Sequence, residues 1–251
     1  ATEQFTYWLN DPQDPDSISL NSVSSIFPAP DGTLWLGTNG GGVNHFDQGT
    51  GKFIAYHLED DAVLEVLVDR AGNVWVGTFT GGLFDLNPST GEAIAYHHDP
   101  QDNRSIGEGA IQAILLDRQD RLWVGTSAGG LNLYNPEIGN FVRYTTDSSN
   151  PFSLPANNIQ AIYQDRDDVL WVGTSNSGLS RFDPLNNRFY TYTSHPEQDS
   201  RLASNSVYAI YQDESGVYWV ATLGIDLFDP YQSKFTHIFS DPGNPQSLID
   251  N

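Results

Sequence analysis

The chain has 251 residues, no Cys and no Met, and 32 acidic against 11 basic residues, for a net charge of −21. Without Cys, disulfides, thiolate catalysis and cysteine-ligated metal centres are excluded, and the negative charge disfavours phosphate backbones and anionic lipid as partners. No apolar segment is long enough to span a bilayer, so we expect neither nucleic-acid binding nor membrane insertion in this segment.

A short motif of Trp, an aliphatic residue, a small residue and Thr occurs five times. Successive copies are 40 to 48 residues apart, a period typical of β-propellers and other repeat arrays. The copies begin at Trp35, Trp75, Trp123, Trp171 and Trp219. When the copies are aligned on these tryptophans, each unit contains four short apolar segments separated by turn residues, which predicts four strands.

The first two predicted strands of each unit are joined by a tight turn. Gly or Asp stands three positions before the tryptophan, because this turn needs a positive φ. Four units also have Asp six positions before the tryptophan, where we expect its side chain to hydrogen-bond the turn backbone; the first unit has Ala29 instead. The tryptophan and the glycine two residues later share one face of the second strand, so adjacent blades should interlock there.

The third and fourth strands follow, and further pieces of the pattern occur at the two ends. Phe5–Trp8 matches the fourth-strand pattern but has no unit of its own, and Ser247-Leu248 repeats the residues that lead into a first strand. We interpret the chain as a piece of a longer array. Alone, it is expected to form an incomplete ring that dimerises or aggregates.

The sequence therefore predicts an all-β fold, a β-propeller with five visible four-stranded blades. The expected divisions are residues 1–17 for an orphan outer strand and linker, 18–58 for blade 1, 59–101 for blade 2, 102–149 for blade 3, 150–198 for blade 4, 199–240 for blade 5 and 241–251 for a linker to a missing blade.

The unit resembles the two-component regulator propeller repeat, which combines Asn-x-Val-x-x-Ile, Asp-x-x-Gly-x-Leu-Trp-Val-Gly-Thr, Gly-Leu-x-x-Phe-Asp-Pro and Phe-x-x-Tyr. The copy from Asn158 to Tyr192 has nearly every element, whereas Asp120 and Asp168 replace the turn glycine and Ala221 replaces the motif glycine. The resemblance implies a larger ring of about seven blades. It also implies a periplasmic or extracellular sensor segment of a larger, membrane-anchored signalling protein such as a hybrid histidine kinase, often responsive to carbohydrates.

No catalytic or metal-binding constellation is recognisable. The adjacent pair His97-His98 would point to opposite faces of a strand. Three acids stand out from those at the repeated turn positions, and we expect Glu65, Glu108 and Asp226 to be solvated or channel-facing. We expect no cofactor, no metal and no catalytic residue.

The candidate ligand site is predicted from the positions of residues within the repeat. In a propeller the first strands line the channel, and the fourth-to-first and second-to-third connections open on one face, here called the connection face. Residues eleven and fourteen positions before each tryptophan vary in chemistry while their apolar neighbours repeat, which indicates a differentiated surface. Arg104 is one of few cations, and aromatic rings beside amides would suit a sugar. The predicted ligand-binding set is Asn21, Ser24, Phe79, Arg104, Gln112, Asn157, Gln160, Asn205 and Tyr208.

The function predicted from these features is a non-enzymatic sensor module for a glycan or other small polar ligand. Two alternatives remain: a propeller enzyme, either streptogramin-lyase-like or a glycoside hydrolase, and a protein-interaction platform. A convergent pair of acids, or a histidine with an acid at the channel mouth, would favour the enzyme. A flat apolar patch would favour the platform.

Overall fold

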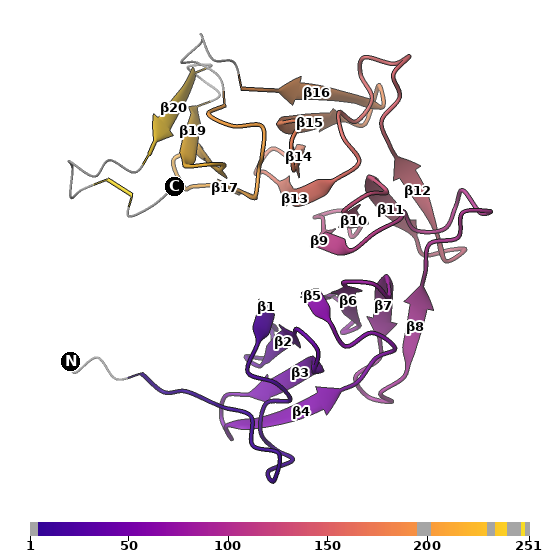
Figure 1. Ribbon diagram of the computed structural model, residues 1–251, viewed down its shortest axis with the longest axis vertical. Coiled ribbons are helices and arrows are strands. Elements are labelled where there is room, and N and C mark those ends of the chain that lie inside the picture. The colour runs from indigo at the N-terminus through magenta and orange to yellow at the C-terminus, as the bar shows by residue number, and fades with distance from the viewer. Residues whose placement is uncertain (1–4, 195–201, 230–233, 240–246, 249–251) are drawn as a thin grey trace. The chain divides into compact units, whose positions relative to one another are not determined.

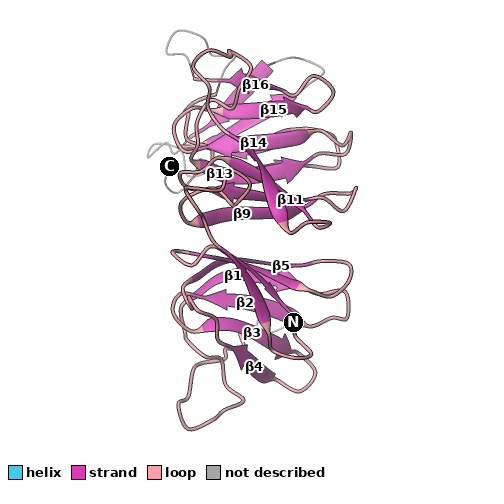
Figure 2. Cartoon of the chain, turned by 90° about the vertical axis from the view of Figure 1, so that its right-hand side faces the viewer, coloured by secondary structure: helices cyan, strands magenta, loops and turns pink. Residues whose placement is uncertain are grey.

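The computed structural model describes residues 5–194, 202–229, 234–239 and 247–248. These residues form five four-stranded antiparallel sheets without a helix (Figure 2), which confirms the predicted all-β propeller architecture. Within each sheet, strands adjacent in sequence are neighbours (Figure 1). The described parts of blades 1 and 2, with residues 109–114, make one compact unit, here unit 1, and the other described residues from 100 onward make unit 2.

In unit 1, blade 1 consists of β1 (Val23–Pro28), β2 (Leu34–Thr38), β3 (Gly42–Asp47) and β4 (Lys52–Tyr56), and blade 2 of β5 (Val63–Val68), β6 (Val74–Thr78), β7 (Leu83–Leu86) and β8 (Ala93–Tyr96). Blade 3 consists of β9 (Ile111–Leu116), β10 (Leu122–Thr126), β11 (Leu131–Asn135) and β12 (Asn140–Tyr144). Blade 4 consists of β13 (Ile159–Gln164), β14 (Leu170–Thr174), β15 (Leu179–Asp183) and β16 (Arg188–Tyr192), and blade 5 of β17 (Ala209–Gln212), β18 (Tyr218–Ala221), β19 (Ile225–Asp229) and β20 (Lys234–Ile238).

The turn between the first two strands is held by the repeated aspartate. In blade 3, Oδ1 of Asp117 accepts hydrogen bonds from the backbone N–H groups of Gln119 and Arg121 at 3.0 and 2.9 Å. This confirms the expected structural role of the aspartate. The other carboxylate oxygen, Oδ2, accepts the indole N–H of Trp123 at 2.8 Å, a link that the sequence analysis did not predict.

The same aspartate–indole link occurs in three further blades. The Oδ2–Nε1 distances are 3.2 Å for Asp69–Trp75, 2.7 Å for Asp165–Trp171 and 2.7 Å for Asp213–Trp219. A buried indole N–H needs an acceptor, and the aspartate supplies it without leaving the turn. Each link therefore ties the turn to the tryptophan strand of its own blade.

The motif glycine lets adjacent blades approach closely, as predicted. A Cβ on Gly37 would lie 2.5 Å from Val63 Cγ1 of blade 2, and one on Gly173 would lie 2.6 Å from Val207 Cγ1 just before β17. Such distances are shorter than carbon–carbon contacts allow. The first-strand side of the following blade therefore packs directly on the backbone of the tryptophan strand.

Four of the repeated tryptophans are core residues. Trp35, Trp75, Trp123 and Trp171 are between 1% and 5% exposed, whereas Trp219 is 38% exposed. Tryptophans also contact rings of the following blade, as where Trp171 lies 5.1 Å from the ring of Tyr218. Among the described residues, no aromatic ring of another blade packs on Trp219, in keeping with its greater exposure.

The N-terminal segment differs from the prediction. Phe5–Trp8 forms no strand, so the expected orphan outer strand is not present here. A fourth strand needs a third strand to pair with, and every third strand in the described residues already pairs with the fourth strand of its own blade. Trp8 instead packs edge-on against Phe46, with ring centroids 4.9 Å apart.

Candidate functional site

Three members of the predicted ligand-binding set use their side chains to hold the connections in place. Oδ1 of Asn157 accepts the backbone N–H of Thr146 at 2.8 Å, and Oδ1 of Asn205 accepts that of Ser194 at 2.7 Å. Asn21 accepts the backbone N–H of Asn10 at 2.7 Å in the same way. These oxygens therefore shape the connection face, whatever else the residues bind.

The other six members are less uniform. Ser24 donates to the carbonyl of Val63 at 2.6 Å, Gln160 donates to Asn158 Oδ1 at 3.0 Å, and Nε of Arg104 lies 3.5 Å from Asp102 Oδ1. Phe79 and Tyr208 are exposed by 59% and 54%, and Gln112 is half-buried on β9. The predicted set is divided between the two units, so the convergence of all nine residues on one ligand stays a prediction. Unit 1 contains Asn21, Ser24, Phe79 and Gln112, and unit 2 contains Arg104, Asn157, Gln160, Asn205 and Tyr208.

Unit 2 contains a cavity of about 640 Å³ on the connection face, here called the connection cavity. It lies between the segment that leads into blade 4 and the loop that joins β14 to β15. Its lining is Thr146, Asp147, Ser148, Asn150, Pro151, Ser153, Leu154, Pro155, Asn176, Ser177, Thr191, Thr193 and Asn205. Asp147 is the one charged residue in this lining, so the cavity presents mainly neutral hydroxyl and amide groups.

The wall of the connection cavity is fixed by local hydrogen bonds. The backbone N–H of Asp147 donates to Ser153 Oγ at 3.0 Å, and that hydroxyl donates back to the Asp147 carbonyl at 3.1 Å. The carboxylate of Asp147 accepts the hydroxyl of Ser149 at 2.6 Å and its backbone N–H at 2.9 Å. These two bonds, the hydroxyl first, lower the pKa of Asp147, so the loop keeps an ionised and internally paired acid.

Several polar side chains of the lining have no such partner. Among the described residues, no hydrogen bond is formed by the side chains of Ser148, Asn176 and Thr193, by the hydroxyl of Thr146, or by the amide nitrogen of Asn150. Polar groups that converge on a preformed cavity are the usual means of orienting a ligand. Of the predicted set only Asn205 lines the cavity.

The sequence contains one signal for the segment that forms the cavity wall. Part of this segment is repeated near the C-terminus, where Asn150-Pro151 and Ser153-Leu154 recur as Asn244-Pro245 and Ser247-Leu248. The repetition identified the segment as a connection between blades but did not show that it lines a cavity.

The acids that lie outside the repeated turn positions have different environments. Glu108 is exposed, as expected, whereas Glu65 is half-buried and accepts the hydroxyl of Ser25 at 3.1 Å. Burial raises the pKa of Glu65, against the smaller opposing influence of the Ser25 hydrogen bond. No second carboxylate that would pair with Glu65 is hydrogen-bonded to it in the described residues.

The expectation that Asp226 is solvated or channel-facing is wrong. Its side chain is fully buried and accepts the Nδ1–H of His237 at 2.5 Å, the hydroxyl of Thr222 at 3.0 Å and the backbone N–H of Ala203 at 3.2 Å. The physical reason is its place in the second position of the third strand. In blade 1 the equivalent residue, Asn44, accepts the backbone N–H of Ser19 at 2.9 Å, so this position anchors the incoming connection.

Within the part of the chain that the structure describes, no cluster of three or more His, Asp and Glu residues could hold a metal ion. The same residues include no helix long and apolar enough to cross a membrane.

Comparison with known proteins finds a matching family model and several structurally similar proteins. The model of the two-component regulator propeller family matches residues 17–40, 105–128, 153–176 and 201–224. The extracellular domain of a protein named as a hybrid two-component system, from B. thetaiotaomicron, is 28% identical with a TM-score of 0.72 over 88% of this chain. The chain spans 31% of the length of that domain.

Two more distant structures share the fold. Virginiamycin B lyase from Staphylococcus aureus is 15% identical with a TM-score of 0.65, over 88% of this chain and 71% of the lyase. PorZ, a surface component of the type-IX secretion system of Porphyromonas gingivalis, is 17% identical with a TM-score of 0.64, over 91% of this chain and 35% of PorZ. No curated protein matches the chain.

Proposed function

We propose that this chain, which is built from two-component regulator propeller repeats, is a ligand-binding sensor segment on the outer side of the membrane in a larger signalling protein. The proposal is supported by the four matched repeats and by the similarity to an extracellular domain of a hybrid two-component system. Binding would change how blades or domains associate, and the rest of the protein would transmit that change to an output domain.

The connection cavity is the observation that carries the choice of ligand. Its volume of about 640 Å³ lies in the range of small-molecule sites, roughly 300–1,000 Å³. Its unpartnered groups are hydroxyls and amides, which hydrogen-bond sugar hydroxyls without requiring a charged ligand. We therefore propose a carbohydrate or another small, neutral, polar ligand, with Asn205 from the predicted set in direct contact and Gln160 and Tyr208 as further contacts.

A binding screen followed by calorimetry tests this proposal. The chain is applied to a glycan array, and each glycan that binds is titrated into the wild type and into Asn176→Ala, Thr193→Ala, Gln160→Ala and Tyr208→Ala. The cavity variants Asn176→Ala and Thr193→Ala are each expected to bind about tenfold more weakly, as the loss of one ligand hydrogen bond predicts. Weaker binding is also expected for Gln160→Ala and Tyr208→Ala, which change the proposed contacts outside the cavity lining. Asn140→Ala, which removes an amide of unit 2 outside the cavity, should bind normally.

Two results would count against the proposal. If a confirmed ligand binds Asn176→Ala and Thr193→Ala with wild-type affinity, the connection cavity is not its site. If mass spectrometry after incubation shows that the ligand has been cleaved, the chain is an enzyme on the same scaffold and not a non-enzymatic sensor.

A further inference from the structure

The first blade lacks the aspartate that the other four blades place against their tryptophan. Ala29 occupies this position, and the turn still forms: Ala29 N–H donates to the Thr33 carbonyl at 2.9 Å, and Gly32 N–H donates to the Ala29 carbonyl at 3.0 Å. The equivalent backbone bonds in blade 2, around Asp69, are 3.0 and 3.1 Å long. Blade 1 therefore differs by the absence of one carboxylate, with the backbone unchanged.

That absence leaves donors without an acceptor. Trp35 is 4% exposed, and among the described residues its indole N–H has no hydrogen-bond partner. Since no buried side-chain nitrogen or oxygen of the described residues lacks a partner, this N–H is reached by solvent. The backbone N–H of Asp31 is equivalent to one that donates to the aspartate in the other blades. Within the described part of the chain it has no acceptor outside its own residue. The backbone N–H of Thr33 is equivalent to the second N–H that donates to the aspartate in the other blades. In blade 1 it donates to Asp31 Oδ1 at 3.0 Å.

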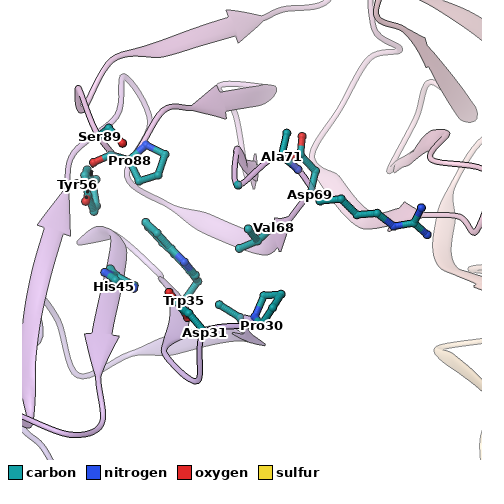
Figure 3. Close-up of a pocket in the computed structure, with 13 residues that line it drawn as sticks. Pro30, Asp31, Trp35, His45, Tyr56, Val68, Asp69, Ala71, Pro88 and Ser89 are labelled. Atoms are coloured by element: carbon teal, nitrogen blue, oxygen red, sulfur yellow. Dashed lines mark hydrogen bonds between the residues drawn. The ribbon is translucent and has the colours of Figure 1, made fainter.

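The space of the missing carboxylate is part of a cavity of about 450 Å³, here called the Trp35 cavity. It lies between the turns that follow β1, β5 and β7, on the face opposite to the connections. Figure 3 shows Trp35 in the middle of the lining, with His45 and Tyr56 on one side and Val68 on the other.

The blade that follows blade 1 also lacks a partner that another blade pair provides. In the pair of blades 4 and 5, Tyr218 lies 5.1 Å from the ring of Trp171 and donates its hydroxyl to the aspartate of blade 4 at 2.6 Å. The residue at the position of Tyr218 in blade 2 is Val74, which has neither a ring nor a hydroxyl. Blades 1 and 2 thus lack both the carboxylate and the hydroxyl that donates to it in the pair of blades 4 and 5.

The charged groups of the lining are compatible with an added carboxylate. Asp31 is engaged by Thr33 through its hydroxyl at 2.6 Å, and Asp69 by the indole of Trp75 and by its own turn. Arg70 also belongs to the lining. His45 stacks on Trp35 with ring centroids 4.5 Å apart and fixes the plane of the indole.

We propose that the Trp35 cavity binds a small molecule through a carboxylate group that takes the place of the aspartate present in the other four blades. The carboxylate accepts the indole N–H of Trp35 and the backbone N–H of Asp31. The remaining volume admits a molecule of about monosaccharide size. This second site does not depend on the ligand or the location of the proposed sensor function.

The indole N–H resonances of the tryptophans report directly on this contact. Sodium acetate is titrated into the chain at constant pH and ionic strength, with the Trp35 resonance assigned from Trp35→Phe. We expect a saturable shift of the Trp35 resonance and no shift of the Trp75 resonance, because Asp69 already occupies the acceptor position there. Acetamide, which is neutral and of similar shape, and sodium sulfate should give no comparable shift.

Ala29→Asp is the decisive variant, because it restores the residue of the other blades. It is expected to weaken acetate binding at Trp35 about tenfold or more and to raise the melting temperature. Its folding is checked by the remaining indole resonances, and if it does not fold, Ala29→Asn carries the same prediction for binding. An unmoved Trp35 resonance, an equal response to sulfate, or an unchanged acetate shift in the folded variant would overturn the proposal.

Discussion

Blades 1 and 3 contain the same turn, with its aspartate in blade 3 and without it in blade 1. In blade 3 the carboxylate of Asp117 joins two turn N–H groups to the indole of Trp123, whereas blade 1 has Ala29 and a tryptophan without an acceptor. Both turns keep a residue with positive φ, at Gly32 (φ 86°) and Asp120 (φ 59°). The turn therefore forms with or without the aspartate, which, where it is present, accepts hydrogen bonds from both the turn backbone and the indole.

The largest expected effect is the loss of a core indole. Trp123→Ala should lower the free energy of unfolding by about 3–5 kcal/mol, the usual loss for a large aromatic core residue, because the side chain is 1% exposed. Trp35→Ala should cost less, since one side of its ring already borders a cavity. Urea denaturation of both variants measures the difference, and equal losses would contradict the proposed distinction between the blades.

Converting blade 3 into a copy of blade 1 should have a smaller effect. Asp117→Ala leaves the buried Trp123 N–H without its acceptor, which should cost about 1–3 kcal/mol. Asp117→Asn retains a carbonyl oxygen at the same place and should recover part of that loss. The denaturation midpoints of the two variants give the comparison; a neutral Asp117→Ala would show that the indole link contributes nothing to stability.

Much of the fold could be predicted from the sequence because the strand, turn and glycine positions recur in register with the tryptophan. The role of Asp117 in the turn followed from its distance along the chain, since both partners are local. Its bond to Trp123 could not be predicted in the same way, because it depends on where the indole ring lies across the sheet. Ala29 was noted as an exception, but only the structure showed that an unpaired indole N–H and a cavity accompany it.

The candidate site was less accessible to sequence analysis for a related reason. Asn157 and Asn205 were selected because their position varies in chemistry among the units, and the structure gives their side-chain oxygens to backbone N–H groups of the connections. The unpartnered groups belong instead to Asn176 and Thr193, which lie on a loop and just beyond a strand end. Which polar groups of a connection face remain unpaired depends on how each connection folds, and the repeat does not encode this.

The same distinction between paired and unpaired polar groups predicts a modest effect on the connection face. Asn157→Ala should lower the free energy of unfolding by about 0.5–1.5 kcal/mol, because the N–H of Thr146 loses its acceptor. Asn176→Ala should change it by less than about 0.5 kcal/mol, since an exposed side chain without a partner contributes little. Thermal denaturation of the two variants measures this difference. A loss of stability for Asn176→Ala as large as that for Asn157→Ala would show that the Asn176 amide has a structural role.

The smallest expected effect is a local titration in blade 5 that blade 1 should lack. The hydroxyl of Ser215, followed by the indole of Trp219, lowers the pKa of Asp213 from 3.8 to about 2. A carboxylate with a depressed pKa in the folded state contributes stability that is complete above its unfolded pKa and is lost as the pH falls through the folded one. The contribution of Asp213 should therefore disappear between about pH 4 and pH 2.

The indole N–H resonance of Trp219, which is bonded to Asp213 at 2.7 Å, makes this titration observable. It should shift on acidification with a midpoint near pH 2, following the pKa of Asp213, and Asp213→Asn should abolish the shift. The Trp35 resonance should show no such titration, because no carboxylate accepts its N–H. A midpoint near the ordinary pKa of an aspartate, about 3.9, would mean that the indole link does not hold Asp213 in its ionised form. The turns of blades 1 and 5 would then differ only in how their side chains pack.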